Sequence, residues 1–159
     1  MKVMNVAVVG AGIYGINHVN AYTWNPNTNL VAVCDLNKEI TDRIAEQYNV
    51  KTYNDVNEML DNEEIDAVSI ATPDAFHMDP ALAAIRHGKP ILVEKPLATT
   101  SEDAKKILAE AEKYNVRVAV DCHVLCESDT KSTLNNCYRL FCAVHSFKCF
   151  IRHHEYFCH

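Results

Sequence analysis

The sequence predicts an α/β fold built on a doubly wound parallel sheet, and three observations support this. Short apolar runs alternate with helical patterns over residues 1–121, which is typical of parallel strands joined by crossover helices. A glycine-rich segment at 10–15 directly follows the first apolar run and opens a helical stretch. An acidic residue, Asp35, closes the second apolar run, twenty residues beyond Gly15.

The expected strands are short, rich in Val and Ile, and apolar on both faces, as buried parallel strands are. We place them at 5–9, 30–34, 51–53, 67–71, 91–93 and 117–120. Helices are expected between them, the first two at 16–24 and 38–48. Asp79 is the expected cap of a third helix, with Pro80 at its first position and Gly88 just past its end. A fourth helix should begin at 101–103, where two acids favour the positive end of the helix dipole.

The glycine-rich segment, GAGIYG, predicts a dinucleotide site because it lies between a strand and a helix and is followed by Asp35. Gly10 permits the tight turn, Gly12 lets the backbone approach a pyrophosphate, and Gly15 lets the helix pack closely on the strand. The unpaired N–H groups of the new helix would face the phosphates. Asp35 can accept hydrogen bonds from a ribose diol, and its charge would repel a 2′-phosphate. The alternative is a tight turn that binds no ligand.

Two further segments follow strands at the same edge of the sheet, where ligands bind in open α/β folds. Thr72-Pro73 follows the strand at 67–71, and Glu94-Lys95-Pro96 follows the strand at 91–93. A lysine held there could place a cationic donor beside a cofactor ring or a substrate hydroxyl, with Glu94 holding or tuning it. The alternative is a surface ion pair beside a loop proline.

Composition narrows the range of partners. The chain has 159 residues, room for one ordinary domain, and a net charge of −6, which argues against a general nucleic-acid or membrane-surface binder. No apolar stretch approaches the roughly 18 residues that a membrane span needs. The first residues run straight into a strand, so we expect no signal peptide and a cytoplasmic location.

The chain resembles the Gfo/Idh/MocA oxidoreductases over about residues 3–124. The matching segments are GAGIYG at 10–15, CD at 34–35, and IATPDAFHMDPALAAIRHGKPILVEKPLATT at 70–100. The resemblance implies an NAD(P)-binding Rossmann domain with the three glycines under the pyrophosphate, Ile13 and Tyr14 packed near it, and Asp35 on the adenosine ribose.

The resemblance also implies residues at the other end of the cofactor. Glu94 and Lys95 would stand near the nicotinamide and the substrate, with Lys95 as the candidate catalytic residue. The dinucleotide channel would be lined by Ala71, Thr72, Pro73 and His77. For His77 the alternative is a histidine that is hydrogen-bonded locally and has a structural role.

The expected cofactor is NAD, because Asp35 is followed by Leu36 and Asn37 with no arginine to receive a 2′-phosphate. Lys38 lies close enough in sequence for NADP to be used as well. A small polyol or sugar would be the substrate, provided that a substrate domain is supplied.

Composition changes near residue 122, so we expect a dinucleotide-binding domain at 1–121 and an atypical tail at 122–159. The family carries an α+β substrate domain with an acid–base histidine after its Rossmann half, whereas no Asp-x-x-x-His follows residue 124 here. We therefore expect cofactor binding with little or no turnover by this chain alone. The alternative function is a non-catalytic dinucleotide-binding sensor or interaction module.

Three interpretations of the tail remain open. It can be the end of a truncated or frame-shifted enzyme, which the abrupt run of unrelated Cys, His and Phe favours. It can hold zinc, although the candidate ligands do not match a Cys-x-x-Cys pattern; they are Cys137, Cys142, His145 and Cys149. It can also be the native end of a short protein that packs on a sheet edge or on a partner. We expect no metal site elsewhere.

Overall fold

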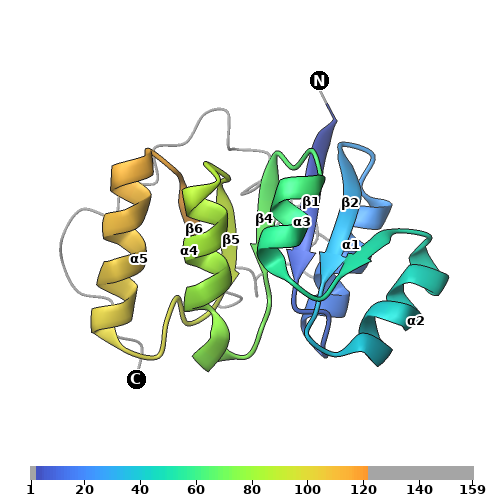
Figure 1. Cartoon of the computed structure of the whole chain (residues 1–159), viewed down its shortest axis with the longest axis horizontal. Helices are drawn as coiled ribbons and strands as arrows, with labels where there is room; N and C mark the ends of the chain where they lie inside the picture. The colour runs from blue at the N-terminus through green and yellow to red at the C-terminus, as the bar shows by residue number, and fades with distance from the viewer. Residues whose placement is uncertain (1–2, 122–159) are drawn as a thin grey trace, which may run out of the picture. The chain divides into compact units, whose positions relative to one another are not determined.

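The computed structural model describes residues 3–121. They form a six-stranded parallel sheet with the order β3-β2-β1-β4-β5-β6, which confirms the doubly wound α/β fold (Figure 1). The strands are β1 (Met4–Val9), β2 (Thr28–Cys34), β3 (Lys51–Tyr53), β4 (Ala67–Ile70), β5 (Ile91–Glu94) and β6 (Val118–Asp121). Each expected strand is present, with its ends within two residues of the prediction.

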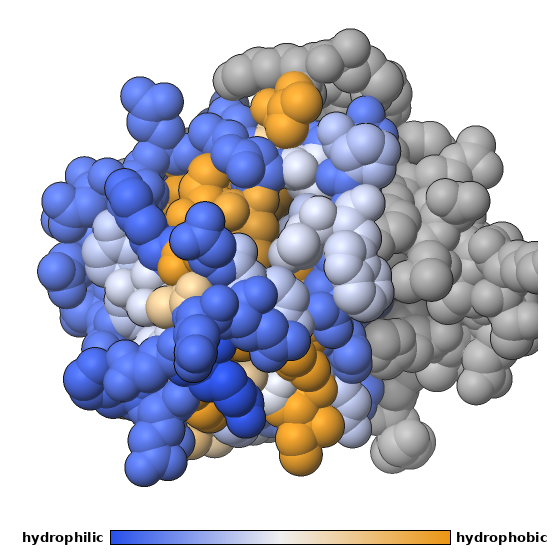
Figure 2. Space-filling view, turned by 90° about the vertical axis from the view of Figure 1, so that its right-hand side faces the viewer, coloured by the Kyte–Doolittle hydropathy of each residue, from blue (hydrophilic) through white to orange (hydrophobic). Residues whose placement is uncertain are grey.

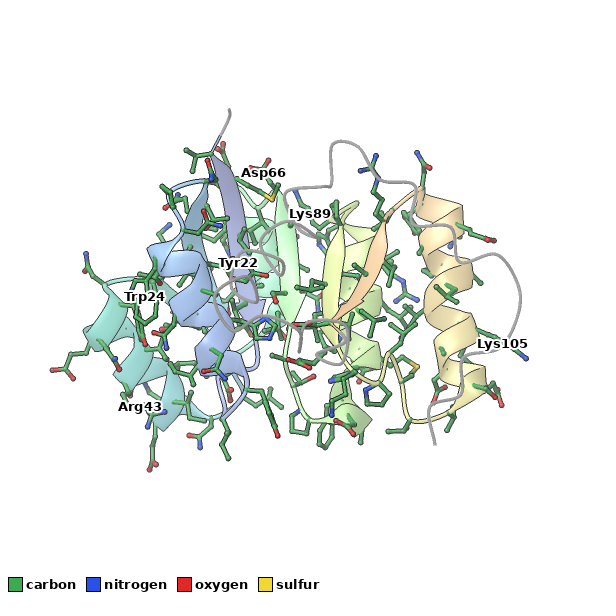
Figure 3. The ribbon with its side chains drawn as sticks, turned by 180° about the vertical axis from the view of Figure 1, so that it is seen from behind. Tyr22, Trp24, Arg43, Asp66, Lys89 and Lys105 are labelled. Atoms are coloured by element: carbon green, nitrogen blue, oxygen red, sulfur yellow. The ribbon has the colours of Figure 1, made fainter. Side chains whose placement is uncertain are left out.

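The helices form one layer on each face of the sheet. The layer seen in front in Figure 1 consists of α3 (Val56–Asn62), α4 (Met78–Arg86) and α5 (Ser101–Tyr114). The opposite layer consists of α1 (Gly15–Trp24) and α2 (Lys38–Tyr48), and it faces the viewer in Figure 3. The chain changes face between β3 and β4, so the strand order reverses at β1 and β4. In folds of this kind, ligands bind at the carboxyl ends of the strands at this reversal.

Burial of apolar side chains explains the arrangement. The strands β4 and β5 are buried at every position, and β1 is buried from Val6 to Val9. Ile44 of α2 and Ile107 of α5 have no exposed surface and close the core from opposite faces. By contrast, β6 is half-buried throughout, because it is an edge strand of the sheet. At the other end, the surface over α2 is mostly hydrophilic (Figure 2).

The expected start of the third helix was wrong. The helix α4 begins at Met78, so Asp79 is its second residue and not its cap. A short 3₁₀ turn, η1 (Asp74–Phe76), precedes it and leaves His77 already in a helical conformation. Pro80 is tolerated at the third position because the first N–H groups of a helix have no partner within the helix. Gly88, at φ +70°, does end the helix as expected.

The helix α3 was missed by the sequence analysis, although its start carries a capping signal. The Asp55 side chain accepts a hydrogen bond from the Glu58 N–H at 2.9 Å. Acidic residues at these two positions are typical of a helix N-terminus.

Among residues 3–121, no helix has the length and apolar character of a membrane span. The interpretations of the tail at 122–159, the zinc site included, lie outside the described residues.

Candidate functional site

A pocket of about 800 Å³ opens at the carboxyl ends of the strands, within the usual size range of ligand sites. It runs between the segments that follow β1, β2, β3, β4 and β5. Most of the predicted site residues line it: Gly10, Gly12, Ile13, Tyr14, Asp35, Ala71, Thr72, Pro73, Glu94 and Lys95. Two predicted residues, Gly15 and His77, are not among the residues that line it.

Two of the three glycines are required by close backbone packing. Gly10 has φ +86°, and a Cβ there would lie 2.6 Å from the backbone nitrogen of Thr72. A Cβ on Gly15 would lie 1.9 Å from the carbonyl oxygen of Gly10. Neither neighbour can move away, because both atoms belong to the backbone. These glycines therefore fold the loop tightly against the end of β4.

Gly12 differs, because a Cβ there would meet nothing within 4 Å. This residue is exposed, and the space above it belongs to the pocket. The neighbouring Ile13 and Tyr14 are also exposed, at 87% and 64%. Within the described residues, no side chain caps the start of α1, and its first turn carries no acid. An open backbone surface at the N-terminal end of a helix fits a dinucleotide pyrophosphate.

Asp35 links the glycine loop to the end of β2. One carboxylate oxygen accepts a hydrogen bond from the Ala11 N–H at 2.8 Å, and the other accepts one from the Asn37 N–H at 2.9 Å. Each carboxylate oxygen has two lone pairs, so both keep the capacity to accept a ribose hydroxyl. Asp35 is therefore placed to hold the loop and a ribose together.

The pocket beside Asp35 is acidic. The pKa of the Cys34 thiol is raised to about 12, mainly by burial and in addition by the nearby carboxylates of Asp55 and Asp35. The Cys34 side chain is thus a neutral thiol at physiological pH.

Lys38, the cation considered for a 2′-phosphate, forms an ion pair with Asp42 at 2.8 Å and does not line the pocket.

His77 lies behind the pocket wall. It has no exposed surface, its Nδ1 lies 2.8 Å from the Pro96 carbonyl oxygen, and its Nε2 lies 2.8 Å from the Thr72 carbonyl oxygen. The ring therefore ties the segment after β4 to the segment after β5. This geometry favours the structural alternative for His77.

Glu94 and Lys95 follow β5 at the end of the pocket away from Asp35. Glu94 is 7% exposed, and its Oε2 accepts a hydrogen bond from the Lys95 N–H at 3.2 Å. Its Oε1 lies 3.1 Å from Nε2 of His18, whose Nδ1 lies 2.8 Å from the Ser69 hydroxyl. His18 and Ser69 were missed by the sequence analysis. A histidine three residues after Gly15, on the side of α1 that faces the sheet, was the available signal.

The sequence analysis also missed the pocket wall near Asp35. Residues that follow β2 and β3 supply it, among them Leu36, Ile40, Asn54, Asp55 and Val56. Asn54 donates a hydrogen bond to the Asp35 carbonyl oxygen and so joins the ends of these strands. The capping signal at Asp55 would have placed a helix there, and with it the wall.

Comparison with known proteins identifies the family of the chain. Residues 4–122 match the model of an oxidoreductase family described as having an NAD-binding Rossmann fold, Gfo/Idh/MocA. The chain belongs to this family. It is 38% identical over 119 residues to inositol 2-dehydrogenase 2 of Saccharopolyspora erythraea, covering 74% of this chain and 35% of that protein. It is 34% identical over 120 residues to the rhizopine catabolism protein MocA of Rhizobium meliloti, covering 76% and 38%.

Solved structures agree at the level of the fold. GenD2 from gentamicin A biosynthesis, solved with NAD, superposes with a TM-score of 0.74 at 28% identity, covering 79% of this chain and 36% of GenD2. The WlbA dehydrogenase from Bordetella pertussis, solved with NADH and UDP-GlcNAcA, has a TM-score of 0.72 at 27% identity, covering 76% and 35%. The chain thus spans about a third of the length of the relatives it matches.

Proposed function

We propose that this chain binds NAD as the cofactor-binding portion of a Gfo/Idh/MocA oxidoreductase that acts on a sugar or cyclitol hydroxyl or the matching carbonyl. The observation that carries the proposal is the open backbone at Gly12, in one pocket with Asp35 and with Glu94-Lys95. A dinucleotide has a phosphate pair, a ribose diol and a reactive ring at corresponding positions. The names of the relatives, inositol 2-dehydrogenase among them, support the substrate class.

Each part of the pocket then has a proposed role in binding NAD or the substrate. The open backbone at Gly12, at the N-terminal end of α1, holds the pyrophosphate, and Asp35 holds the adenosine ribose. When bound, the nicotinamide would supply or accept a hydride. Lys95 is the cationic group that polarises a substrate hydroxyl, and Glu94 fixes the backbone at Lys95 through its carboxylate. Ile13 and Tyr14 shield the phosphates from solvent.

We expect NAD to bind more tightly than NADP. Asp35 and Asp55 make the adenosine end of the pocket negative, and Lys38 is paired with Asp42. A 2′-phosphate would meet these carboxylates, and like charges brought together repel. Titration of NADH and of NADPH, followed by nicotinamide fluorescence, measures both Kd values. Tighter binding of NADPH would contradict the preference.

We also expect the 159 residues alone to bind the cofactor without appreciable turnover. Hydride transfer also needs a positioned base for the substrate hydroxyl proton, which contributes about 10²–10⁴-fold in rate, and the substrate must be held in line. Lys95 alone provides neither a second acid–base group nor the far wall of a substrate pocket. Assays with NAD and a panel of inositols and sugars test this, and turnover above roughly 1 s⁻¹, an ordinary enzyme rate, would refute it.

The second candidate is a non-catalytic dinucleotide-binding module that acts as a sensor or interaction partner. The same open pocket supports it, because binding requires nothing beyond the residues already named. Binding of NADH that persists with no turnover, in this chain and after addition of a family substrate domain, would favour the module over the enzyme portion.

A further inference from the structure

A hydrogen-bonded chain of three buried side chains lies behind the Lys95 end of the pocket. It runs from Ser69 of β4 through His18 of α1 to Glu94 of β5, with distances of 2.8 Å and 3.1 Å. Ser69 is fully buried, and His18 and Glu94 are 8% and 7% exposed. Neither Ser69 nor His18 lines the pocket, whereas Glu94 does. The three residues therefore join the core of the sheet to the pocket wall.

The chemistry of the three side chains decides which group donates in each of these hydrogen bonds. A carboxylate oxygen can only accept, so the His18 Nε2 must carry the proton and donate it to Glu94 Oε1. In the neutral ring Nδ1 then accepts, and the Ser69 hydroxyl donates to it. Glu94 Oε2 in turn accepts the Lys95 N–H at 3.2 Å. The sequence of bonds thus ends on the backbone of the candidate catalytic residue.

The carboxylate of Glu94 has a second acid beside it. Asp121 is its partner residue on β6, and carboxylate oxygens of both lie within 4.8 Å of the His18 nitrogen and of one another. Two carboxylates this close repel, which would push Glu94 away from its position. The Nε2–H of His18 offers a directional, charge-assisted hydrogen bond that opposes this.

His18 also belongs to the helix that starts at the glycine loop. It lies one turn beyond Gly15, and its ring packs against Tyr22 with the ring centres 6.4 Å apart. In Figure 3, Tyr22 lies on α1 where that helix covers the sheet. The ring orientation is therefore fixed from both sides, by Tyr22 and by Ser69.

We infer that His18 is a positioning residue for the nicotinamide end of the site. By holding the Glu94 carboxylate, it sets the backbone at Glu94-Lys95 against which the nicotinamide half of the cofactor lies. This inference rests on the proposed function, because it assumes that NAD occupies the pocket. The residues at the adenosine end, Asp35 and Gly12, do not take part in the chain of hydrogen bonds.

Two substitutions separate positioning from simple core packing. In His18→Gln the amide nitrogen can take the place of Nε2 and still donate to Glu94. In His18→Asn the shorter side chain can reach Ser69 but loses the donor to Glu94. Both replace the ring by a smaller amide, so each is the control for the other. ADP, which lacks the nicotinamide half, is the control ligand.

We expect His18→Asn to weaken NADH binding about tenfold, the usual effect of losing a hydrogen bond to a charged group, and to change the Kd of ADP less than twofold. In His18→Gln the Kd of NADH should stay within about threefold of the unsubstituted chain. Equal weakening of NADH and ADP, or an unchanged Kd of NADH in His18→Asn, would overturn the inference. If the unsubstituted chain binds neither ligand, the proposed function itself fails.

A measurement on the unsubstituted chain covers the case in which the variants do not fold. Nitrogen NMR of the histidine rings should show His18 as the Nε2–H form, with ring signals that shift on addition of NADH and stay in place with ADP. An Nδ1–H form, or signals that NADH leaves unmoved while its binding saturates, would overturn the inference.

Discussion

At the scale of single residues, backbone N–H groups hold the two acids that matter most for the site. Asp35 accepts from Ala11 and Asn37, and Glu94 accepts from Lys95. Such bonds fix a carboxylate more firmly than a flexible ion pair does, because backbone donors lose little freedom on binding. The carboxylates of Asp35 and Glu94 are therefore held in place by the fold itself.

Cys34 provides a test of the environment beside Asp35. Because burial, together with the nearby carboxylates, raises the pKa of its thiol to about 12, the reactive thiolate is scarce at pH 8. We expect iodoacetamide to label it on the order of 10³-fold more slowly in the folded than in the unfolded chain. Mass spectrometry of the peptide that contains Cys34 distinguishes it from the other cysteines. Comparable labelling rates in the folded and the unfolded chain would contradict a buried Cys34 thiol with a raised pKa.

The same shift has a consequence for stability. A thiol whose pKa is higher in the folded than in the unfolded state stabilises the fold fully below the unfolded value. This contribution should be lost progressively as the pH rises from about 9 to about 12.

At the scale of elements, the turn from β1 into α1 combines two requirements in one loop. Gly10 and Gly15 are needed for folding, because any side chain there would strike backbone atoms. Gly12 has open space above it, and it is the position that we propose for the pyrophosphate. We therefore expect different glycines of this loop to serve stability and binding.

The matched pair Gly12→Ala and Gly15→Ala tests this separation. We expect Gly12→Ala to keep the midpoint of thermal unfolding within about 3 °C, since the new methyl meets no atom, while NADH binding weakens at least about tenfold. Gly15→Ala should lower stability by about 3 kcal/mol or more, because the loop must open. Thermal unfolding by circular dichroism and NADH titration give the two readouts. Equal loss of stability in both variants would contradict the different roles given to Gly12 and Gly15.

The elements were predictable from sequence where local rules decide them. The glycine turn, the strands and the stop at Gly88 follow from backbone freedom and apolar runs, which are properties of adjacent residues. The start of α4 was not predictable, because His77 is held by carbonyls that follow two different strands. His18 was missed for the same reason, since its partners lie 51 and 76 residues away.

At the scale of the whole molecule, the described residues form the NAD-binding Rossmann domain of the family. The proposed phosphate, ribose and nicotinamide positions lie along one edge of a single sheet, on loops that follow four different strands. The matched part of the chain covers about a third of the length of the relatives. We therefore expect NAD to bind along this edge of the sheet, at residues that can be mapped one by one.

Amide NMR of the ¹⁵N-labelled chain, titrated with NAD⁺, tests this claim most directly. We predict saturable shifts that cluster at residues 10–15, at Asp35, at Ala71 and Thr72, and at Glu94 and Lys95. The amides on the exposed side of α2 should stay in place. An absence of shifts at millimolar NAD⁺, or shifts gathered away from the carboxyl ends of the strands, would contradict the account.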